Sequence, residues 1–423
     1  MPNEQAGARP GEGGLGSSPT DGRRRPAWLN RSVIGMGITS FLSDAGHEMV
    51  TTLLPTFLTL IGAPAAALGL IEGVADATSS FVKLLAGWYT DRIGRRKELV
   101  VGGYLLTGIA GGFLALAAAW PLVLVFRALA WFGRGVKAPL RDAMLADSVP
   151  NESLGRAFGF HRTGDTLGAI AGPLAAVGLL ALLGGGSVVG HYRVVFLVSV
   201  IPGVSAAVAF AVLVAERRRE PNHGLRLWLT IRSLPGAYLR LLVGVGLFGM
   251  GNFAPTLLIL AATELLTARY GIGRAAQIAG LLYVLHNVLY ALVSYPVGAL
   301  SDRWGRRGLL AAGYLIGGVM ASGFVLAFWL HWSALPWLVV LFALAGTLMG
   351  TQDALEGAIV ADHVDSVHRG TAYGLMATVN GVGDFVASAL VGLLWTLVSP
   401  VVAFAYAAVL MFAGAGVLLV IRR

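Results

Sequence analysis

The sequence predicts an all-α membrane protein built from two similar halves of six transmembrane helices each. Hydrophobic residues make up 56% of the 423 residues and charged residues only 13%, which is more apolar surface than a water-soluble chain could hide. Apolar runs long enough to cross a hydrocarbon core of about 30 Å recur between short polar or Gly/Pro breaks. A charged phrase also occurs twice, about half the chain apart, which indicates internal duplication.

The apolar runs define twelve expected spans. Each run ends at a charged residue or at a break that contains Gly or Pro, which are the residues that interrupt helices. The spans lie near residues 32–62, 65–90, 98–119, 121–146, 155–183, 191–214, 237–263, 275–299, 308–330, 336–361, 370–397 and 401–421.

The segments outside the spans divide the chain into domains. Residues 1–28 are rich in Gly, Pro and Arg and lack an apolar stretch that ends in a small-residue cleavage site. We therefore expect a disordered cytoplasmic tail and not a signal peptide. Residues 29–214 should form the first six-helix bundle and residues 237–423 the second. The Arg-rich residues 215–236 are the expected cytoplasmic connector between them.

The Lys and Arg residues predict the orientation in the membrane. If both termini face the cytoplasm, only Arg193, Arg269 and Arg274 of the 31 Lys and Arg residues fall in loops on the opposite side. This asymmetry follows the positive-inside rule and favours a multi-pass protein of a bacterial-type cytoplasmic (inner) membrane. The basic residues are not gathered in one patch, so the net charge of +9 does not indicate a nucleic-acid partner.

The repeated phrase relates the two halves residue by residue. Gly87-Trp-Tyr-Thr-Asp-Arg-Ile-Gly-Arg-Arg96 recurs as Gly298-Ala-Leu-Ser-Asp-Arg-Trp-Gly-Arg-Arg307, at a constant offset of 211 residues. A second match without gaps, at an offset of 215, relates residues 140–159 to residues 355–374. Spans four and five therefore correspond to spans ten and eleven.

The charged residues of both phrases are expected to form a conformational latch at the cytoplasmic helix ends. Glycine permits close helix approach and tight turns, and the carboxylates that end spans four and ten lie on the same side as the arginines. The alternative is that these charges only anchor topology, but two copies facing duplicated carboxylates favour the latch. The expected latch residues are Gly87, Asp91, Arg92, Gly94, Arg95, Arg96, Asp142, Asp147, Asp302, Arg303, Arg306, Glu356 and Asp362.

Further ionisable residues lie deep within the spans, where an unpaired charge costs roughly 3 kcal/mol. They recur on single helix faces in spans one, two, four and five, so we expect these faces to line one water-filled cavity. The expected cavity residues are Glu72, Arg127, Arg134, Asn252, His286, Asn287, Asn380 and Asp384.

Proton coupling is the expected role of a second set of intramembrane residues, namely Asp44, His47, Glu48, Asp76 and Asp165. Such a carboxylate can bind a proton when the cavity opens to the acidic side and release it on the other. The two halves differ here, because the counterparts of Asp76 and Asp165 are the neutral Asn287 and Asn380. The alternative is internal pairing for structure alone, such as Asp76 with Arg127 or Arg134.

These motifs resemble the major facilitator superfamily of secondary transporters over nearly the whole chain. The phrase from Gly87 to Arg96 is similar to the family signature between helices two and three. The run from Gly168 to Gly172 and Pro173 is similar to an element of many proton-coupled exporters, and Arg127 resembles the family's intramembrane arginine. The resemblance implies two pseudo-symmetric six-helix bundles that expose a central site alternately to each side.

Three other functional classes fit the sequence less well. Asp44, His47 and Glu48 share one helix face and could supply three ligands to a transported divalent metal, but a single His is more often a hydrogen-bonding group. No phosphate-binding loop, nucleophile elbow or zinc-protease helix is present, so an enzyme is not expected. A channel fits the paired charges and duplicated latch less well than alternating access does.

The predicted function is therefore transport of a small solute, with proton-coupled export of an organic or drug-like solute favoured. Uptake of a small anionic metabolite, proton-coupled or facilitated, and divalent-metal transport remain alternatives. The cations of span four favour an anionic or zwitterionic solute, whereas the carboxylates of spans one and two favour a cation. The expected partners are the solute, protons and the lipid bilayer. We expect a monomer without a cofactor or a bound structural metal.

Overall fold

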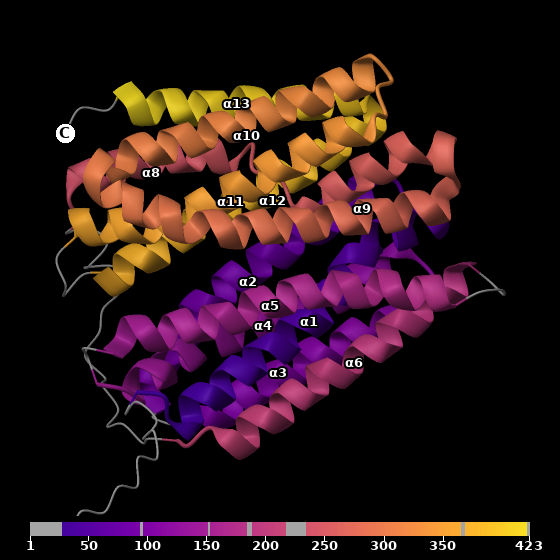
Figure 1. Ribbon diagram of the computed structural model, residues 1–423. Coiled ribbons are helices and arrows are strands. Elements are labelled where there is room, and N and C mark those ends of the chain that lie inside the picture. Colours follow the sequence, from indigo (N-terminus) through magenta and orange to yellow (C-terminus); the bar gives the residue numbers. More distant parts are fainter. Residues whose placement is uncertain are drawn as a thin grey trace, which may run out of the picture.

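A computed structural model of the chain describes residues 28–93, 96–150, 153–183, 188–216, 234–364 and 369–420. Within these ranges the protein is helical, with twelve α-helices, one short 3-10 helix and no strand (Figure 1). The first half contains α1 (Arg31–Leu60), α2 (Ala65–Ile93), α3 (Lys97–Phe113), η1 (Leu114–Leu116), α4 (Trp120–Asp147), α5 (Leu154–Leu182) and α6 (Val188–Leu213). The second half contains α8 (Gly236–Gly249), α9 (Pro255–Trp304), α10 (Arg306–Trp329), α11 (Leu335–His363), α12 (Arg369–Leu397) and α13 (Pro400–Val420).

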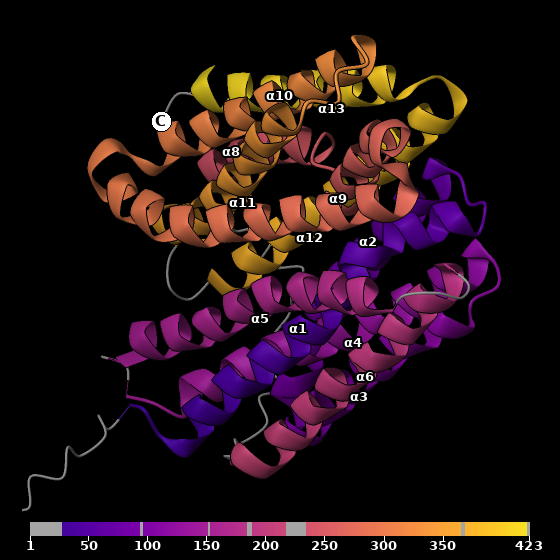
Figure 2. The same cartoon turned by 45° about the vertical axis from the view of Figure 1, so that its right-hand side comes forward.

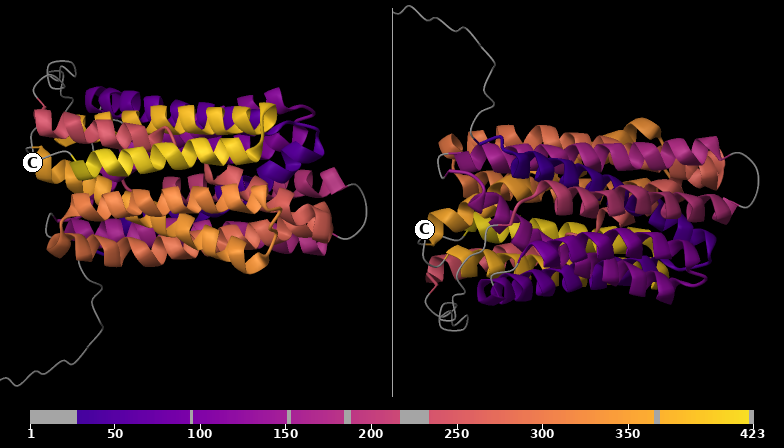
Figure 3. Two further views of the ribbon diagram at one scale, coloured as in Figure 1. Left: turned by 90° about the horizontal axis from the view of Figure 1, so that it is seen from above. Right: turned by 90° about the horizontal axis from the view of Figure 1, so that it is seen from below.

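The helices form two bundles whose internal packing is the same. In the first half α1 packs on α5, α2 on α4 and α3 on α6, and in the second half α8 packs on α12, α9 on α11 and α10 on α13. The bundles meet where α2 packs on α12 and α5 on α9. Their helix axes are inclined to one another in Figures 1 and 2, and the helices of both run lengthwise side by side in Figure 3. The predicted pseudo-symmetric fold is confirmed.

Nine helices in the described ranges are long and apolar enough to cross a membrane. One of them is α9, which holds two expected spans. The helices outside the nine are α1 and α4, which carry the intramembrane charges, and α8, which has only 14 residues. Polar residues that face an internal cavity lower the hydropathy of a helix without exposing it to lipid.

The seventh span differs from the continuous helix expected over 237–263. It is interrupted between the end of α8 at Gly249 and the start of α9 at Pro255. Pro255 has no N–H for a helical bond and disfavours helix at the residue before it, which has extended backbone. Gly251 also allows this segment to approach Ala407, since a Cβ there would lie 2.7 Å from the Ala407 carbonyl oxygen. The break brings Asn252 to the interior of the bundle.

Two glycines with positive φ end the spans that follow. Gly271, with φ of 74°, separates the rest of the seventh span from the eighth within α9. Gly305, with φ of 88°, turns the chain from α9 into α10 and belongs to the second charged phrase. Only glycine adopts such angles readily, which explains its place in that phrase. Gly298 of the same phrase faces open space, so close helix approach is not its role.

Some predictions fall outside the described residues. The tail up to residue 27, most of the connector at 217–233, and Gly94 and Arg95 of the first phrase belong to this group. Gly87, Asp91 and Arg92 lie in α2, and Asp302 lies in α9, but their side chains are not described. The domain boundaries and this part of the latch stay predictions.

A stripe of glycines in α5 lets it pack directly against α1. A Cβ on Gly164, Gly168 or Gly172 would come within 3.0 Å of the carbonyl oxygen of Gly37, Phe41 or Ala45, respectively. The Gly168 and Gly172 contacts lie beside Asp44 and Glu48 of α1. The exporter-like element of α5 therefore sets the position of two predicted proton-coupling residues.

We expect Gly168→Ala and Gly172→Ala to destabilise the first half by about 1–3 kcal/mol or more, because backbone cannot move aside for the added methyl group. The apparent melting temperature of detergent-purified protein measures this effect. Gly178→Ala is the matched control in the same helix, since its Cβ would meet open space. Equal melting temperatures for all three variants would contradict the packing role.

Candidate solute cavity

A cavity of about 480 Å³ lies between the two halves and is lined by residues from both. Its walls come from α1, α2, α4 and α5 on one side and from the break before α9 and helices α9–α13 on the other. All the residues predicted for proton coupling or for the cavity line it, namely Asp44, His47, Glu48, Glu72, Asp76, Arg127, Arg134, Asp165, Asn252, His286, Asn287, Asn380 and Asp384.

Two ion pairs in the first half use the arginines of α4. Arg127 donates from Nε and Nη2 to the two carboxylate oxygens of Glu72, at 3.2 Å each, and from Nη2 to the Thr51 hydroxyl. The Arg127 and Glu72 side chains are only 2% and 3% exposed. Arg134 Nη1 lies 3.4 Å from Asp44 Oδ1. The expected alternative pairing of Asp76 with either arginine is therefore wrong.

Trp131 lies between these arginines, a feature that the sequence analysis missed. The guanidinium carbons of Arg127 and Arg134 lie 5.6 and 5.4 Å from its ring centroid, and His47 contacts it edge-on at 5.3 Å. Cations over an indole face are stabilised by its electron-rich ring. Arg127 lies four residues before Trp131 and Arg134 three residues after it, which places the three side chains on one helix face. This spacing was the sequence signal for the stack.

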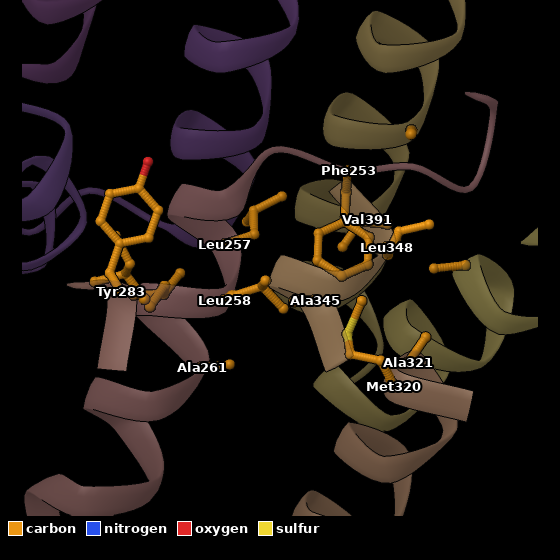
Figure 4. Close-up of a cluster of buried hydrophobic side chains, with 14 of the residues drawn as sticks. Phe253, Leu257, Leu258, Ala261, Tyr283, Met320, Ala321, Ala345, Leu348 and Val391 are labelled. Carbon is orange, nitrogen blue, oxygen red and sulfur yellow. The ribbon is translucent and has the colours of Figure 1, made fainter. Parts of the chain in front are cut away.

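Two direct contacts join the halves at the level of the cavity. The Tyr283 hydroxyl donates to Glu48 Oε2 at 2.9 Å, and Asn287 Nδ2 donates to the Ala169 carbonyl oxygen at 2.8 Å. Figure 4 shows the Tyr283 hydroxyl directed away from the apolar cluster of the second half. His286 lies beside Asn287, with Nδ1 3.1 Å from its Oδ1. The second-half amide Asn287 thus contributes to the interface between the halves.

The remaining first-half carboxylates differ in their partners. Asp165 lies 3.5 Å from His161, whose other ring nitrogen is 2.5 Å from the Ser40 hydroxyl. Asp76 makes neither an ion pair nor a side-chain hydrogen bond with any residue in the described ranges. Asp384 of α12 lines the same cavity, and Gly381, three residues before it, lies next to the Asp76 carbonyl oxygen.

The second-half carboxylates are held by neutral groups. Asn252 Nδ2 donates to Asp384 Oδ1 at 3.3 Å. Glu356 accepts from Asn380 Nδ2 at 2.5 Å and from the Tyr314 hydroxyl at 3.0 Å. Glu356 was expected in the latch, but it is buried in the cavity wall and its described bonds are to these neutral groups. About two turns of helix separate it from the charged end of α11 at His363, where that prediction placed it.

At the helix ends, latch residues form ion pairs within each half. Arg96 Nη1 lies 2.9 Å from Asp147 Oδ2, and Arg306 Nη1 lies 2.5 Å from Asp362 Oδ1. The two carboxylates correspond by symmetry, whereas Arg306 corresponds to Arg95, outside the described ranges. We call the end that carries these pairs the charged end. Asp142 pairs with its neighbour Arg141 at 3.0 Å, and Arg303 is exposed in the last turn of α9.

At the opposite end the two halves are packed backbone to backbone. A Cβ on Gly69 or Gly73 of α2 would come within 3.0 Å of a carbonyl oxygen of α12. The Ala66 backbone N–H also donates to the Thr396 hydroxyl at 2.8 Å. Contacts this close leave no passage between α2 and α12 at this end.

Toward the charged end the halves are joined by a polar cluster that the sequence analysis did not predict, which we call the gate cluster. Asp353 of α11 accepts from Arg162 of α5 and from the Tyr290 hydroxyl of α9, both at 2.5 Å. Arg162 also contacts Tyr290. The side chains of Arg162 and Asp353 are 55% and 42% exposed. Water therefore reaches the gate cluster, and the cluster closes the cavity only in part. The pairing of Arg162 with a residue 191 positions away leaves no local sequence signal.

The metal alternative finds no support in the geometry. Across the described part of the chain, no three His, Asp or Glu side chains are placed to hold one ion. Asp44 is directed to Arg134, His47 to Trp131 and Glu48 to Tyr283. The three residues share a helix face but not a common centre.

The chain is similar to transporters by sequence. The family model of the Major Facilitator Superfamily matches residues 36–275 and 257–423. An uncharacterised MFS-type transporter of Methanocaldococcus jannaschii is 32% identical, covering 90% of this chain and 92% of that protein. A gentisate transporter of Corynebacterium glutamicum is 28% identical over 78% of this chain and 74% of its own. The multidrug resistance protein MdtG of Escherichia fergusonii is 27% identical, with 70% and 72% covered.

Solved structures share the fold at much lower sequence identity. A POT family transporter crystallised with 5-aminolevulinic acid superposes with a TM-score of 0.75 over 92% of this chain and 96% of that one. Its sequence is 11% identical, so this likeness concerns the fold alone.

Asp353→Asn should weaken the gate cluster, because it removes the charged acceptor of both bonds. We expect a single cysteine at the cavity residue Ala377 to react about two- to fivefold faster with an impermeant maleimide added at the charged end, as for loss of an exposed ion pair. The chain contains no native Cys, so the background is nil. Asp142→Asn, which breaks a pair within α4, is the control. Unchanged labelling in both would show that the cluster does not close the cavity.

Proposed function

Because the chain belongs to the Major Facilitator Superfamily of membrane transporters and is not an enzyme, we propose that it exports an organic solute in exchange for protons. The solute would bind in the cavity between the halves, which would then open alternately at the charged end and at the opposite end. The proposal names direction, coupling ion and solute class, which family membership leaves open.

One observation carries the coupling proposal, namely the carboxylates Asp76 and Asp384, which line one cavity from α2 and α12. Neither has a Lys or Arg ion-pair partner among the residues that the structure describes, where the side-chain hydrogen bond to this pair comes from neutral Asn252. Two carboxylates that share a cavity within a bilayer repel unless a proton or a cationic group lies between them. Proton and solute would thus compete for one place, which is the condition for exchange.

The charge balance of the whole cavity supports the same conclusion. Its lining contains more carboxylates than cations, so bound protons or a cationic solute group must compensate part of the difference. The eight carboxylates are Asp44, Glu48, Glu72, Asp76, Asp165, Asp353, Glu356 and Asp384, and the four cations are Lys83, Arg127, Arg134 and Arg162.

The contacts between halves support alternating access. Glycine-mediated packing closes the opposite end, while exposed polar side chains join the halves near the charged end. In this arrangement the solute would enter at the charged end. Opening the opposite end requires α2 to separate from α12, which would also separate Asp76 from Asp384. Proton uptake by this pair and the conformational change would therefore be linked.

Two of the similar proteins support different directions of transport. Similarity to a multidrug resistance protein favours export, and similarity to a gentisate transporter keeps uptake of an organic anion as the second candidate. The Arg127–Trp131–Arg134 stack is the observation that would serve an anion. We favour export, because two carboxylates in one cavity, Asp76 and Asp384, provide for competition between proton and solute.

We further propose that the charged end is cytoplasmic, that both termini lie there, and that the protein works as a monomer in a bacterial-type inner membrane. The bundles would comprise residues 29–214 and 237–423, with residues 215–236 as connector. Arg96, Arg306 and their carboxylate partners at this end agree with the bias of basic residues toward the cytoplasm.

Reporter fusions test this orientation. Fusions at residues 225 and 366 should give the signal of a cytoplasmic reporter, and fusions at 187 and 333 that of a periplasmic one, because basic loops stay inside. A reversed signal at any of the four sites would contradict the proposed topology.

Asp76→Asn and Asp384→Asn test the coupling. In everted vesicles with an imposed pH gradient, we expect each variant to lose uphill solute transport but to keep solute exchange, which needs no net proton release. Solute-dependent alkalinisation or acidification of the vesicle lumen, recorded with a pH-sensitive dye across a panel of labelled solutes, provides the second readout. Glu98→Gln, at an exposed carboxylate in the first turn of α3, is the control. Full gradient-driven transport by both variants would overturn the coupling proposal.

A further inference from the structure

The two walls of the cavity differ in charge. The first-half wall contains all four cations of the lining together with five carboxylates. The second-half wall contains the carboxylates Asp353, Glu356 and Asp384 and no Lys or Arg within the described lining. Positively charged hydrogen-bond donors are therefore available to a solute only on the first-half wall, where they lie among carboxylates, whereas the charged groups of the second-half wall are all acceptors.

The first-half wall has buried donors without acceptors. Trp131 Nε1 is buried and makes no hydrogen bond to any group that the structure describes. Arg134 Nη1 is also buried without a well-formed hydrogen bond, although it lies 3.4 Å from Asp44. The guanidinium of Arg134 lies against the face of the Trp131 ring. An unpaired buried donor costs about 1–3 kcal/mol, so the two N–H groups fit a bound acceptor such as a carboxylate.

The second-half wall has the complementary set. Asn380 Oδ1 is buried without a donor among the described residues, while its Nδ2 is used by Glu356. Thr256, in the first turn of α9, lines the cavity with its side chain 1% exposed and its hydroxyl unpaired. Within the described residues, the side-chain hydrogen bond to Asp384 is the 3.3 Å bond from Asn252. These oxygens fit an ammonium group, which donates three hydrogen bonds.

An apolar surface lies next to the second-half polar groups. Phe253, Leu258, Met320 and Leu348 line the cavity and belong to the buried cluster in Figure 4. Methionine adapts to ligands of different shape, and the surface would accept a hydrocarbon portion between two polar ends.

We propose that the solute is zwitterionic, with a carboxylate bound by Trp131 and Arg134 and an amine bound by Asp384, Asn380 and Thr256. This inference rests on the proposed function, which it extends by naming the solute class. A purely cationic solute would leave the buried Trp131 and Arg134 donors unpaired, and a purely anionic one would leave Asp384, Asn380 and Thr256 of the second-half wall without a charged donor. A solute with both groups pairs both walls and crosses the boundary between the halves.

Binding by the purified full-length protein tests the proposal with a series of ω-amino acids, from β-alanine through γ-aminobutyrate and ε-aminocaproate to longer homologues. Each is compared by titration calorimetry with the amine and the carboxylate of the same carbon count. We expect one member of the series to bind about tenfold tighter than both the amine and the carboxylate of the same carbon count. Loss of either charged group from the solute would leave buried polar groups of the cavity unpaired.

Two conservative variants assign the ends. Trp131→Phe keeps the ring between the arginines but removes its N–H, so the zwitterion should lose its advantage over the amine. Asp384→Asn should remove its advantage over the carboxylate. Trp329→Phe, at a side chain 69% exposed on the surface, should change neither ratio. Equal binding of the amine would assign a cationic solute, equal binding of the carboxylate an anionic one, and binding of no ω-amino acid would exclude the class, so each of these results overturns the proposal.

The binding test separates this inference from the proposed function, because it uses no pH gradient. Zwitterion-selective binding without proton-coupled transport would contradict the proposed function alone. Proton-coupled transport by a protein that prefers solutes with a single charged group would contradict the inference alone.

Discussion

The buried ion pair between Arg127 and Glu72 is the interaction on which the rest of the cavity depends. It uses two donors of the guanidinium and both carboxylate oxygens, and a further bond to Thr51 joins α1 to α2 and α4. Removing one partner of such a pair leaves an uncompensated charge in a low-dielectric interior, at a cost of about 3–5 kcal/mol. The pair therefore fixes the first-half wall, and it engages Arg127 with Glu72 and Thr51.

The distribution of the remaining cations follows from that commitment. Arg134 pairs with Asp44 and Arg162 pairs with Asp353, while Asp76, Glu48, Glu356 and Asp384 lack guanidinium partners in the described part of the chain. Those four carboxylates lie at or near the boundary between the halves, where Tyr283, Asn252 and Asn380 supply neutral donors. Arg127 and Arg134 thus pair within the first half and Arg162 pairs across the boundary, while the carboxylates that we propose to take a mobile partner lie near the surface that must open. A carrier that exchanges protons for solute requires this division.

Much of the fold and the composition of the cavity could be predicted from the sequence. The duplicated phrase and apolar runs predict the twelve spans and the two halves, because lipid allows few other arrangements. Intramembrane charges such as Asp44, Glu72 and Arg134 had to face a cavity for the same reason. Which carboxylate each arginine pairs with could not be predicted, because this depends on how each helix is rotated in the bundle and on how far each side chain extends. Arg127 selected Glu72 in place of Asp76, one turn away on the same face, and Glu356 lies inside the cavity although Asp362 of the same helix remains at its end.

Two features of the structure were not predicted. The gate cluster brings Arg162, Tyr290 and Asp353 together from three helices, and none of them stands in a recognisable motif. The break in the seventh span was signalled by Gly251 and Pro255, but the apolar residues around them resemble a continuous span. Both features concern the relation between the halves, which a pattern within one helix does not encode.

The central claim is that Asp76 and Asp384 hold an exchangeable proton, and infrared difference spectroscopy tests it most directly. Purified protein would be examined for the carbonyl stretch of a protonated carboxylic acid, with and without a solute that binds. The account predicts a band that solute binding removes and that is altered in both Asp76→Asn and Asp384→Asn. A carboxylic acid band unaffected by either substitution, or by a bound solute, would contradict it.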